Sequence, residues 1–230
     1  FSKADEAIKK LKPKGIILSG GPASVNNQDA PTIDDKIFDL KIPILGICYG
    51  QQIMCSLLGG EVEKSNEREF GRANIKFLKS SPLFEGFDIK GNTEPVWMSH
   101  GDKVTSLPKG FEVIAESKNA PFAAVSDEVR SFYGVQFHPE VVHTPNGAKL
   151  LKNFTHKISE CRSNWTMDSF KKVAIENIRT QVGKGKVICG LSGGVDSSVA
   201  AVLIHEAIGD QLTCIYVDTG LMRENETDEV

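Results

Sequence analysis

Residues 42–58 read IPILGICYGQQIMCSLL. The apolar run at 42–47 predicts a buried strand. A helical pattern then runs from Gly50 to Leu58 and stops at Gly59-Gly60, where glycine commonly ends a helix. Between the two lies the pattern G-x-C-x-G, with Cys48 at its centre. This stretch therefore predicts a strand, a sharp turn and a helix, with a cysteine thiol at the turn.

The same alternation of strands and helices extends to both sides of this stretch. Residues 15–18 form another continuous apolar run, and 33–40 have helical spacing. Between Val62 and Gln136 we expect shorter elements that are richer in turns, with strands at 111–115, 122–125 and 132–137. Helices between strands predict parallel pairing, and the later strands predict an antiparallel extension. The expected fold class is α/β, with a mixed sheet flanked by helices.

A second α/β unit is expected to begin after residue 168. An apolar-striped helix at 147–158 is followed by 160–168, where the periodic pattern breaks. A fresh run then starts, with a helix at 169–181, a strand at 186–191, a helix at 197–208 and a strand at 212–217. We therefore expect a domain at 1–160, a linker at 161–168, and the first part of a parallel α/β domain at 169–230.

The composition favours a folded, soluble protein with no polyanionic partner. Of 230 residues, 40% are hydrophobic and 25% are charged, and the formal net charge of −3 offers no basic surface for nucleic acid. No apolar run approaches the roughly 20 residues that a membrane span requires. The five cysteines are odd in number and show no C-x-x-C spacing, which favours reduced thiols in the cytoplasm.

The turn at Cys48 has the form of a nucleophile elbow. Glycines at 46 and 50 allow a strained turn, and the start of the following helix favours a thiolate. His138 and Glu140, two apart in a segment expected to be extended, would address one site. Cys48 is then the candidate nucleophile, His138 the base and Glu140 the group that orients it. Taken alone, Cys48 would equally suit a buried structural cysteine.

Three strings in this part of the chain, SGGP at 19–22, GICYGQQ at 46–52 and GVQFHPE at 134–140, resemble the class I (triad) glutamine amidotransferases. The resemblance covers the first two thirds of the chain. It implies that Cys48 attacks the side-chain amide of glutamine and releases ammonia. It also implies that His138 helps water to hydrolyse the glutamyl thioester that remains.

The same resemblance assigns further residues to the site. It implies that the backbone amides of Gly21 and Tyr49 stabilise the oxyanion and that Gln52 holds the substrate. Gln51 is a departure, because similar enzymes often carry methionine at this position. The resemblance also implies that the first strand of the glutaminase domain is missing. Phe1 is not an initiator methionine, and Val230 stops within what reads as a starting helix, so we expect truncation at both ends.

A second motif lies between the predicted strand at 186–191 and the helix at 197–208. Its glycines, its three hydroxyls and the helix amino terminus predict a nest for phosphate oxygens, and it lacks the lysine of a Walker A loop. The string SGGVDSS resembles the PP-loop of ATP pyrophosphatases, which cleave ATP between its α and β phosphates. That resemblance implies ATP contacts at Ser192, Gly193, Gly194, Val195, Asp196, Ser197 and Ser198.

Asp196 has two interpretations. The resemblance places it near Mg²⁺ and pyrophosphate. The structural alternative is that its carboxylate caps the helix expected to begin near Ser197.

The two motifs occur in the order found in the GMP synthase family, which WMSHGD at 97–102 and YVDTGLMRENE at 216–226 also resemble. The resemblance implies glutamine, ATP and xanthosine monophosphate (XMP) as substrates and Mg²⁺ as a cofactor. It implies adenylation of the XMP 2-oxygen, then displacement by ammonia to give GMP, AMP and pyrophosphate. A homodimer through a region beyond Val230 is also implied, with no nucleic-acid or membrane partner. Two alternatives stay open: a tRNA-modifying or other PP-loop amidotransferase, and a binding or regulatory module with degenerate amidotransferase features.

Overall fold

A computed structural model describes residues 8, 10–89, 93–163, 166–218, 220 and 226–229, with the side chains of 65–68, 226 and 229 left out. The chain divides into two compact units, Phe1–Cys161 and Arg162–Val230. Within the expected linker, Asn164 and Trp165 lie outside the described residues, as do 219 and 221–225 of the string YVDTGLMRENE. Each unit is described by itself below.

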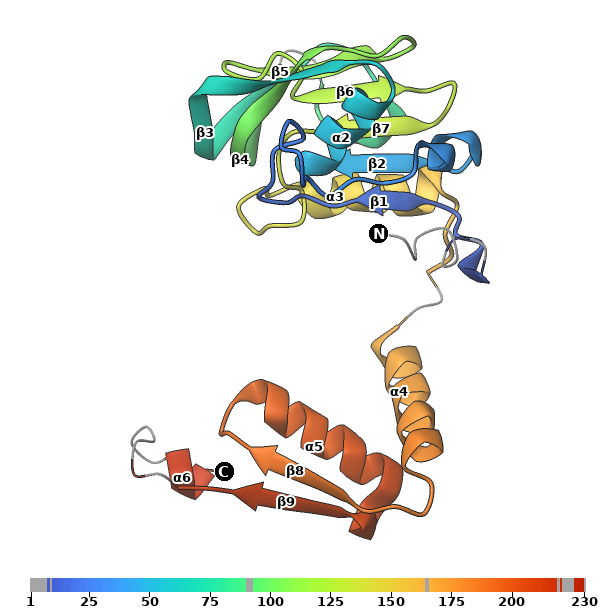
Figure 1. Ribbon diagram of the computed structural model, residues 1–230, viewed down its shortest axis with the longest axis vertical. Coiled ribbons are helices and arrows are strands. Elements are labelled where there is room, and N and C mark those ends of the chain that lie inside the picture. The colour runs from blue at the N-terminus through green and yellow to red at the C-terminus, as the bar shows by residue number, and fades with distance from the viewer. Residues whose placement is uncertain are drawn as a thin grey trace. The chain divides into compact units, whose positions relative to one another are not determined.

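The first unit is built on a seven-stranded mixed sheet in the order β1-β2-β7-β6-β5-β3-β4 (Figure 1). Its strands are β1 (Ile16–Leu18), β2 (Ile44–Ile47), β3 (Glu61–Phe77), β4 (Thr93–Ser106), β5 (Glu112–Ser117), β6 (Ala124–Asp127) and β7 (Phe132–Val135). Strands β1, β2 and β7 are parallel, and the other pairings are antiparallel. The predicted mixed sheet with an antiparallel extension is confirmed.

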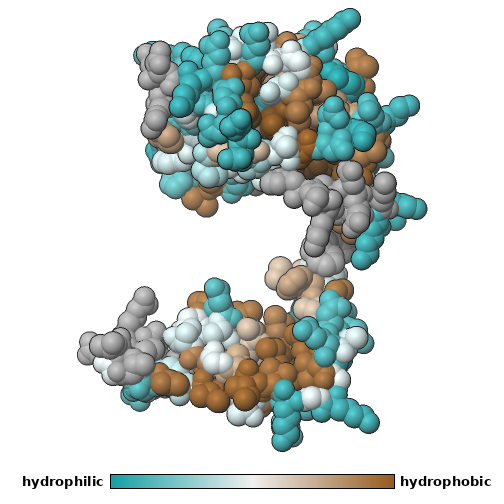
Figure 2. Space-filling model, in the orientation of Figure 1, coloured by the Kyte–Doolittle hydropathy of each residue, from teal (hydrophilic) through white to brown (hydrophobic). Residues whose placement is uncertain are grey.

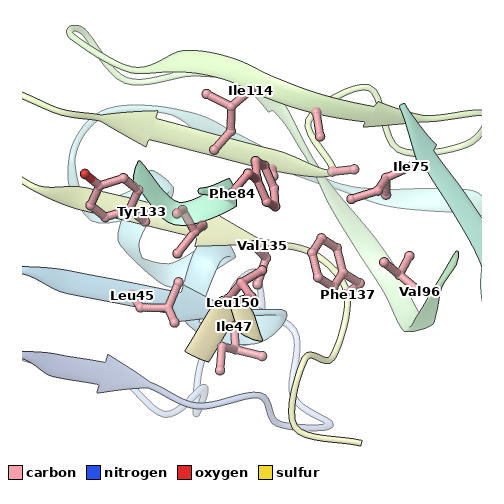
Figure 3. Packing of buried hydrophobic residues seen from close by; sticks show 14 of the residues in the cluster. Leu45, Ile47, Ile75, Phe84, Val96, Ile114, Tyr133, Val135, Phe137 and Leu150 are labelled. Atoms are coloured by element: carbon pink, nitrogen blue, oxygen red, sulfur yellow. The ribbon is translucent and has the colours of Figure 1, made fainter. Parts of the chain in front are cut away.

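Alternate residues of a strand point to opposite faces of the sheet. Because β2 and β7 are buried at every position, they supply apolar side chains to both faces. On one face, Leu45 and Tyr133 pack with Leu150 of α3 (Gly147–Lys152). Figure 3 shows this cluster, which takes side chains from β2, β7, β3, β4 and α3. On the other face, Ile44 and Phe132 pack with Met54 of α2 (Tyr49–Leu57). The strands that carry the candidate site are thus held between two apolar layers.

The expectation of short elements between residues 62 and 136 is wrong, because β3 and β4 contain 17 and 14 residues. Burial along β4 alternates with period two, but two of its inward positions hold His100 and Asp102. Because these buried positions hold polar residues, the sequence of β4 does not show the alternation of apolar and polar residues that predicts a strand. The Cα registers pair β3 with β4 from Glu61 and Ser106 to Lys76 and Thr93, so the two strands form one long antiparallel ribbon.

Two helical predictions also needed correction. The segment at 33–40 forms only a short 3-10 helix, Asp35–Asp39, which buries Ile37 and Phe38 in the same cluster as Ile44 and Phe132. Asp34 accepts a hydrogen bond from the backbone nitrogen of Lys36 and so fixes its start. The predicted helix at 147–158 is present, but after α3 it continues as a π-helix, Asn153–Ile158.

The second unit contains α4 (Met167–Val182), β8 (Val187–Leu191), α5 (Val195–Ile208), a 3-10 turn (Gly209–Gln211), β9 (Leu212–Tyr216) and α6 (Glu226–Glu229). Strands β8 and β9 are parallel, as predicted. Among the residues described in this unit, Ala207 is the one buried apolar side chain. Figure 2 shows apolar side chains gathered on the surface of this unit. Its exposed apolar residues include Ile188, Val199 and Val202.

No helix among the described residues has both the length and the hydropathy that crossing a bilayer would require.

Candidate active site and phosphate-binding loop

Cys48 occupies a strained turn between β2 and α2. Its φ of 51° and ψ of −108° lie outside the regions that a side chain normally favours. The backbone nitrogen of Cys48 donates to the carbonyl of Val135 at 2.7 Å, which extends the pairing of β2 with β7. The residue is 4% exposed and stands at the amino end of α2. The predicted elbow is confirmed.

The two glycines of the elbow are required by close backbone contacts. A Cβ at Gly46 would lie 2.6 Å from the backbone nitrogen of Gln51, and one at Gly50 would lie 1.9 Å from the carbonyl oxygen of Leu18. Both distances are shorter than any tolerable contact. The approach of α2 to the ends of β1 and β2 therefore depends on the absence of side chains here.

His138 reaches the same edge of the sheet because it follows β7, the neighbour of β2. Its backbone nitrogen donates to the carbonyl of Trp97 at 2.9 Å. The hydroxyl of Thr144 donates to the carbonyl of His138 at 2.6 Å and accepts from the backbone nitrogen of Trp97 at 3.0 Å. The prediction of an extended segment at 138–140 is wrong, since β7 ends at Val135 and a turn begins at Pro139.

The imidazole of His138 lies between Cys48 and Glu140. Its Nδ1 is 2.6 Å from Oε1 of Glu140, and its buried Nε2 has no hydrogen-bond partner within the protein. A Cβ at Gly20 would lie 2.9 Å from Cε1 of His138 and 3.5 Å from Cβ of Cys48. Gly20, which follows β1, therefore leaves the space in which the thiol and the imidazole meet.

The electrostatics of this arrangement favour a protonated imidazole. The neighbouring Cys48 thiol, opposed by burial and assisted by Glu140, raises the pKa of His138 to about 9. At neutral pH, His138 would therefore hold the proton that a leaving amine needs.

For the glutamine hydrolysis that the resemblance implies, we expect Glu140→Gln to move the alkaline limit to lower pH. The raised pKa of His138 keeps the proton donor charged up to about pH 9, and the Glu140 carboxylate is one cause of that elevation. Its side chain is 46% exposed, so solvent weakens its effect and we expect a shift of about one pH unit. The measurement is the pH profile of kcat for glutamate release.

Glu112→Gln, which removes a surface carboxylate paired with Lys79, is the control. Superimposable profiles for Glu140→Gln and the unmodified enzyme would contradict this account.

The residues expected around the oxyanion and substrate are also placed at this edge. Gly21 lies beside Tyr49, since a Cβ on Gly21 would be 3.9 Å from Cβ of Tyr49. The hydroxyl of Tyr49 donates to the carbonyl of Pro31, which ties the loop after β1 to α2. Gln52 is 3% exposed and directs both amide protons into the protein, toward the carbonyl of Asp102 and Oε1 of Gln136. Only its carbonyl oxygen is left for a ligand.

Two polar residues near Cys48 were not singled out from the sequence. Nε2 of Gln136 lies 3.7 Å from Sγ of Cys48, and Thr144 fixes the backbone of His138 as described above. Gln136 stands inside the string GVQFHPE, which was the available signal, whereas nothing local marks Thr144. Gln51, the departure noted above, is fully buried and donates from Nε2 to the carbonyl of Phe122 at 2.8 Å.

The loop at 192–198 in the second unit is organised by its own hydroxyls. Ser197 and Ser198 both donate to the carbonyl of Gly194, and Ser192 accepts from the backbone nitrogen of Gly194. Gly193 has a φ of 76°, a left-handed conformation that glycine adopts without strain. The loop leads directly into the amino end of α5, which suits an anion.

Asp196 does not cap α5, so the structural alternative for it is wrong. The helix begins at Val195, two residues earlier than predicted, with Gly194 as its N-cap. Asp196 lies exposed in the first turn, where a carboxylate is favoured by the helix dipole. Among the described residues, no three acidic, histidine or cysteine side chains are grouped for a metal. A single exposed carboxylate beside a loop that suits phosphate is compatible with Mg²⁺, which is often held by one or two carboxylates and substrate phosphates.

Comparison with known proteins gives matches to both units. Residues 1–158 match the family model "Glutamine amidotransferase class-I", and 169–229 match "NAD synthase". Curated relatives include the glutamine-hydrolyzing GMP synthases of Phenylobacterium zucineum and Agrobacterium fabrum, which are 59% and 62% identical over all 230 residues. The chain spans 44% of the length of each of these two relatives.

Solved structures resemble the first unit. A candidate GMP synthase component from Thermoplasma acidophilum is 30% identical, with a TM-score of 0.54 over 70% of this chain and 75% of its own. A glutamine amidotransferase from Thermotoga maritima has a TM-score of 0.53 at 20% identity, over 64% of this chain and 78% of its own, and so supports the fold alone. Since the class I model matches well over half of the sequence and the sheet carries the thiol elbow of that fold, this chain belongs to the class I glutamine amidotransferase family.

Proposed function

We propose that this chain is the glutaminase domain and the beginning of the ATP pyrophosphatase domain of a GMP synthase. The observation that carries the proposal is the identity of about 60% to GMP synthases, which runs through both units rather than one. In this proposal, 1–160 form the glutaminase domain, 161–168 a linker and 169–230 the first part of the ATP-binding domain. Families that share only one of the two motifs do not explain identity across the whole chain.

The glutaminase reaction follows from the arrangement around Cys48. The thiolate attacks the side-chain carbonyl carbon of glutamine, and the oxyanion that forms is stabilised by the backbone amides of Gly21 and Tyr49. His138 gives its proton to the leaving nitrogen, so that ammonia departs and a glutamyl thioester remains. The imidazole then takes a proton from water, which attacks the thioester and releases glutamate. Glu140 orients His138 throughout.

The second reaction would use the loop at 192–198. Its backbone amides and the amino end of α5 suit the phosphates of ATP, and Asp196 would hold Mg²⁺, which supplies positive charge to the phosphate oxygens. The 2-oxygen of XMP takes up the adenylate as pyrophosphate leaves, and ammonia then displaces AMP to give GMP. We further propose that the complete enzyme is a cytoplasmic homodimer and that it binds neither nucleic acid nor membrane.

The test is nitrogen transfer by the full-length enzyme that contains this chain. With XMP, ATP and Mg²⁺, we expect GMP to form from either glutamine or an ammonium salt, with glutamate released only when glutamine is present. Omission of XMP should stop GMP formation and pyrophosphate release together. Failure to form GMP from XMP with either nitrogen source would overturn the assignment.

A further inference from the structure

Sγ of Cys48 has two polar neighbours besides His138. It donates to the carbonyl oxygen of Ser99 at 3.5 Å, and it accepts from Nε2 of Gln136 at 3.7 Å. A carbonyl oxygen can only accept a hydrogen bond, so the contact with Ser99 stabilises the protonated thiol. An amide N–H can only donate, so the contact with Gln136 stabilises the thiolate. The two contacts therefore favour opposite protonation states of the same sulfur.

The direction of the Gln136 amide is set by the residues behind it. The backbone carbonyl of Asp102 accepts from Nε2 of Gln52 at 2.9 Å, so the nitrogen of Gln52 must face that carbonyl. The same nitrogen donates to Oε1 of Gln136 at 3.2 Å. If the Gln136 amide were rotated by 180°, two donor groups would face each other. Gln136 therefore points its oxygen at Gln52 and its nitrogen at Cys48.

Burial and backbone pairing hold this donor in place. Gln136 is 1% exposed and Gln52 is 3% exposed, so water does not compete for their hydrogen bonds. The backbone nitrogen of Gln136 donates to the carbonyl of Ala123 at 2.9 Å, and that of Cys48 donates to the carbonyl of Val135 at 2.7 Å. Donor and sulfur thus lie just beyond the ends of β7 and β2, and the pairing of these two strands fixes their relative position.

We propose that Gln136 is a further catalytic residue, whose Nε2 donates a hydrogen bond to Sγ of Cys48 and stabilises the thiolate that attacks the substrate amide. The catalytic role rests on the proposed glutaminase function, but the effect on thiol ionisation does not. Gln136 stays neutral and takes no proton, so the thiol proton still goes to His138. A hydrogen bond to a charged group is stronger than one to a neutral group, and the donor therefore favours the ionised sulfur.

The experiment compares the pH dependence of alkylation at Cys48 in the full-length enzyme. Iodoacetamide reacts with the thiolate, and mass spectrometry of the peptide that contains Cys48 gives the alkylation rate at each pH. In Gln136→Met, which keeps the length of the side chain but removes the donor, we expect the midpoint of the profile to rise by about one pH unit. We also expect kcat for glutamine hydrolysis to fall about tenfold with KM little changed.

Gln51→Met is the matched control. It removes another buried glutamine amide of the same unit, but one that donates to Phe122 and does not contact the sulfur. Its alkylation midpoint should equal that of the unmodified enzyme. If Gln136→Met does not fold, Gln136→Glu is the second variant to be measured. Its carboxylate keeps an acceptor for Gln52 but turns an oxygen, not a donor, toward the sulfur. We expect it to raise the midpoint of the alkylation profile further than Gln136→Met.

An unchanged midpoint in the folded Gln136 variant, or an equal rise in Gln51→Met, would overturn the role of Gln136. That result would leave the proposed function intact, since GMP formation from XMP is measured separately. Conversely, if no GMP formed but the alkylation midpoint rose as expected in the Gln136 variant, the proposed function would be rejected. The hydrogen bond from Gln136 to Cys48 would still be supported.

Discussion

Replacement of Cys48 by alanine is expected to abolish glutamine-dependent GMP formation in the full-length enzyme while ammonium-dependent formation is retained. Without the sulfur no thioester can form, and we expect glutamate release to fall by a factor of at least about ten thousand. In the proposed function ammonia is used by the ATP-dependent domain, which this substitution does not alter. The measurement is GMP formation with glutamine and with an ammonium salt, alongside glutamate release.

Cys55 provides the matched control, because it lies on the same helix and is also buried. Burial raises the pKa of its thiol to about 12, so it remains protonated and unreactive at neutral pH. Cys55→Ala should therefore hydrolyse glutamine at the normal rate, with only a modest loss of stability from the small cavity. If Cys48→Ala still formed GMP from glutamine, the proposed function would be contradicted.

Gly50→Ala is expected to prevent the elbow from forming. The added Cβ would lie 1.9 Å from the carbonyl oxygen of Leu18 and 2.6 Å from its carbonyl carbon, and both are backbone atoms of β1 that cannot rotate away. Either α2 or β1 must move, which we expect to cost about 3 kcal/mol or more of the free energy of unfolding. Because α2 begins beside Cys48, alkylation of that thiol should lose its normal pH profile as well.

The control for this variant is Gly190→Ala in β8. Among the described residues, apart from its two chain neighbours, no atom lies within 4 Å of a Cβ at that position, and its φ is not positive, so these residues introduce neither a clash nor backbone strain. We expect its unfolding midpoint in urea to match that of the unmodified enzyme. A Gly50→Ala protein with unchanged unfolding and alkylation would show that α2 does not need this close approach.

Local patterns were the ones that could be predicted correctly. The elbow at Cys48 and the loop at 192–198 each depend on residues within a few positions of one another, and both take the expected backbone form. The strands around 15–18 and 44–47 were also predictable from their continuous apolar runs, although only the second is buried on both faces, since Ile17 is 45% exposed. By contrast, β3 and β4 were missed, since charged residues fill much of one and His100 and Asp102 occupy inward positions of the other.

By itself, the sequence determined which residues are chemically suited to the site: a thiol between glycines, a histidine with a glutamate two positions later, and a phosphate-binding loop. Only the tertiary structure decided that the thiol and its partners meet. Cys48 and Gln136 are 88 positions apart in the sequence. They become neighbours because β7, the last strand of this sheet in chain order, pairs with β2. The direction of the Gln136 amide likewise depends on Gln52 and a carbonyl of β4, since hydrogen-bond polarity is set by partners that are remote in sequence.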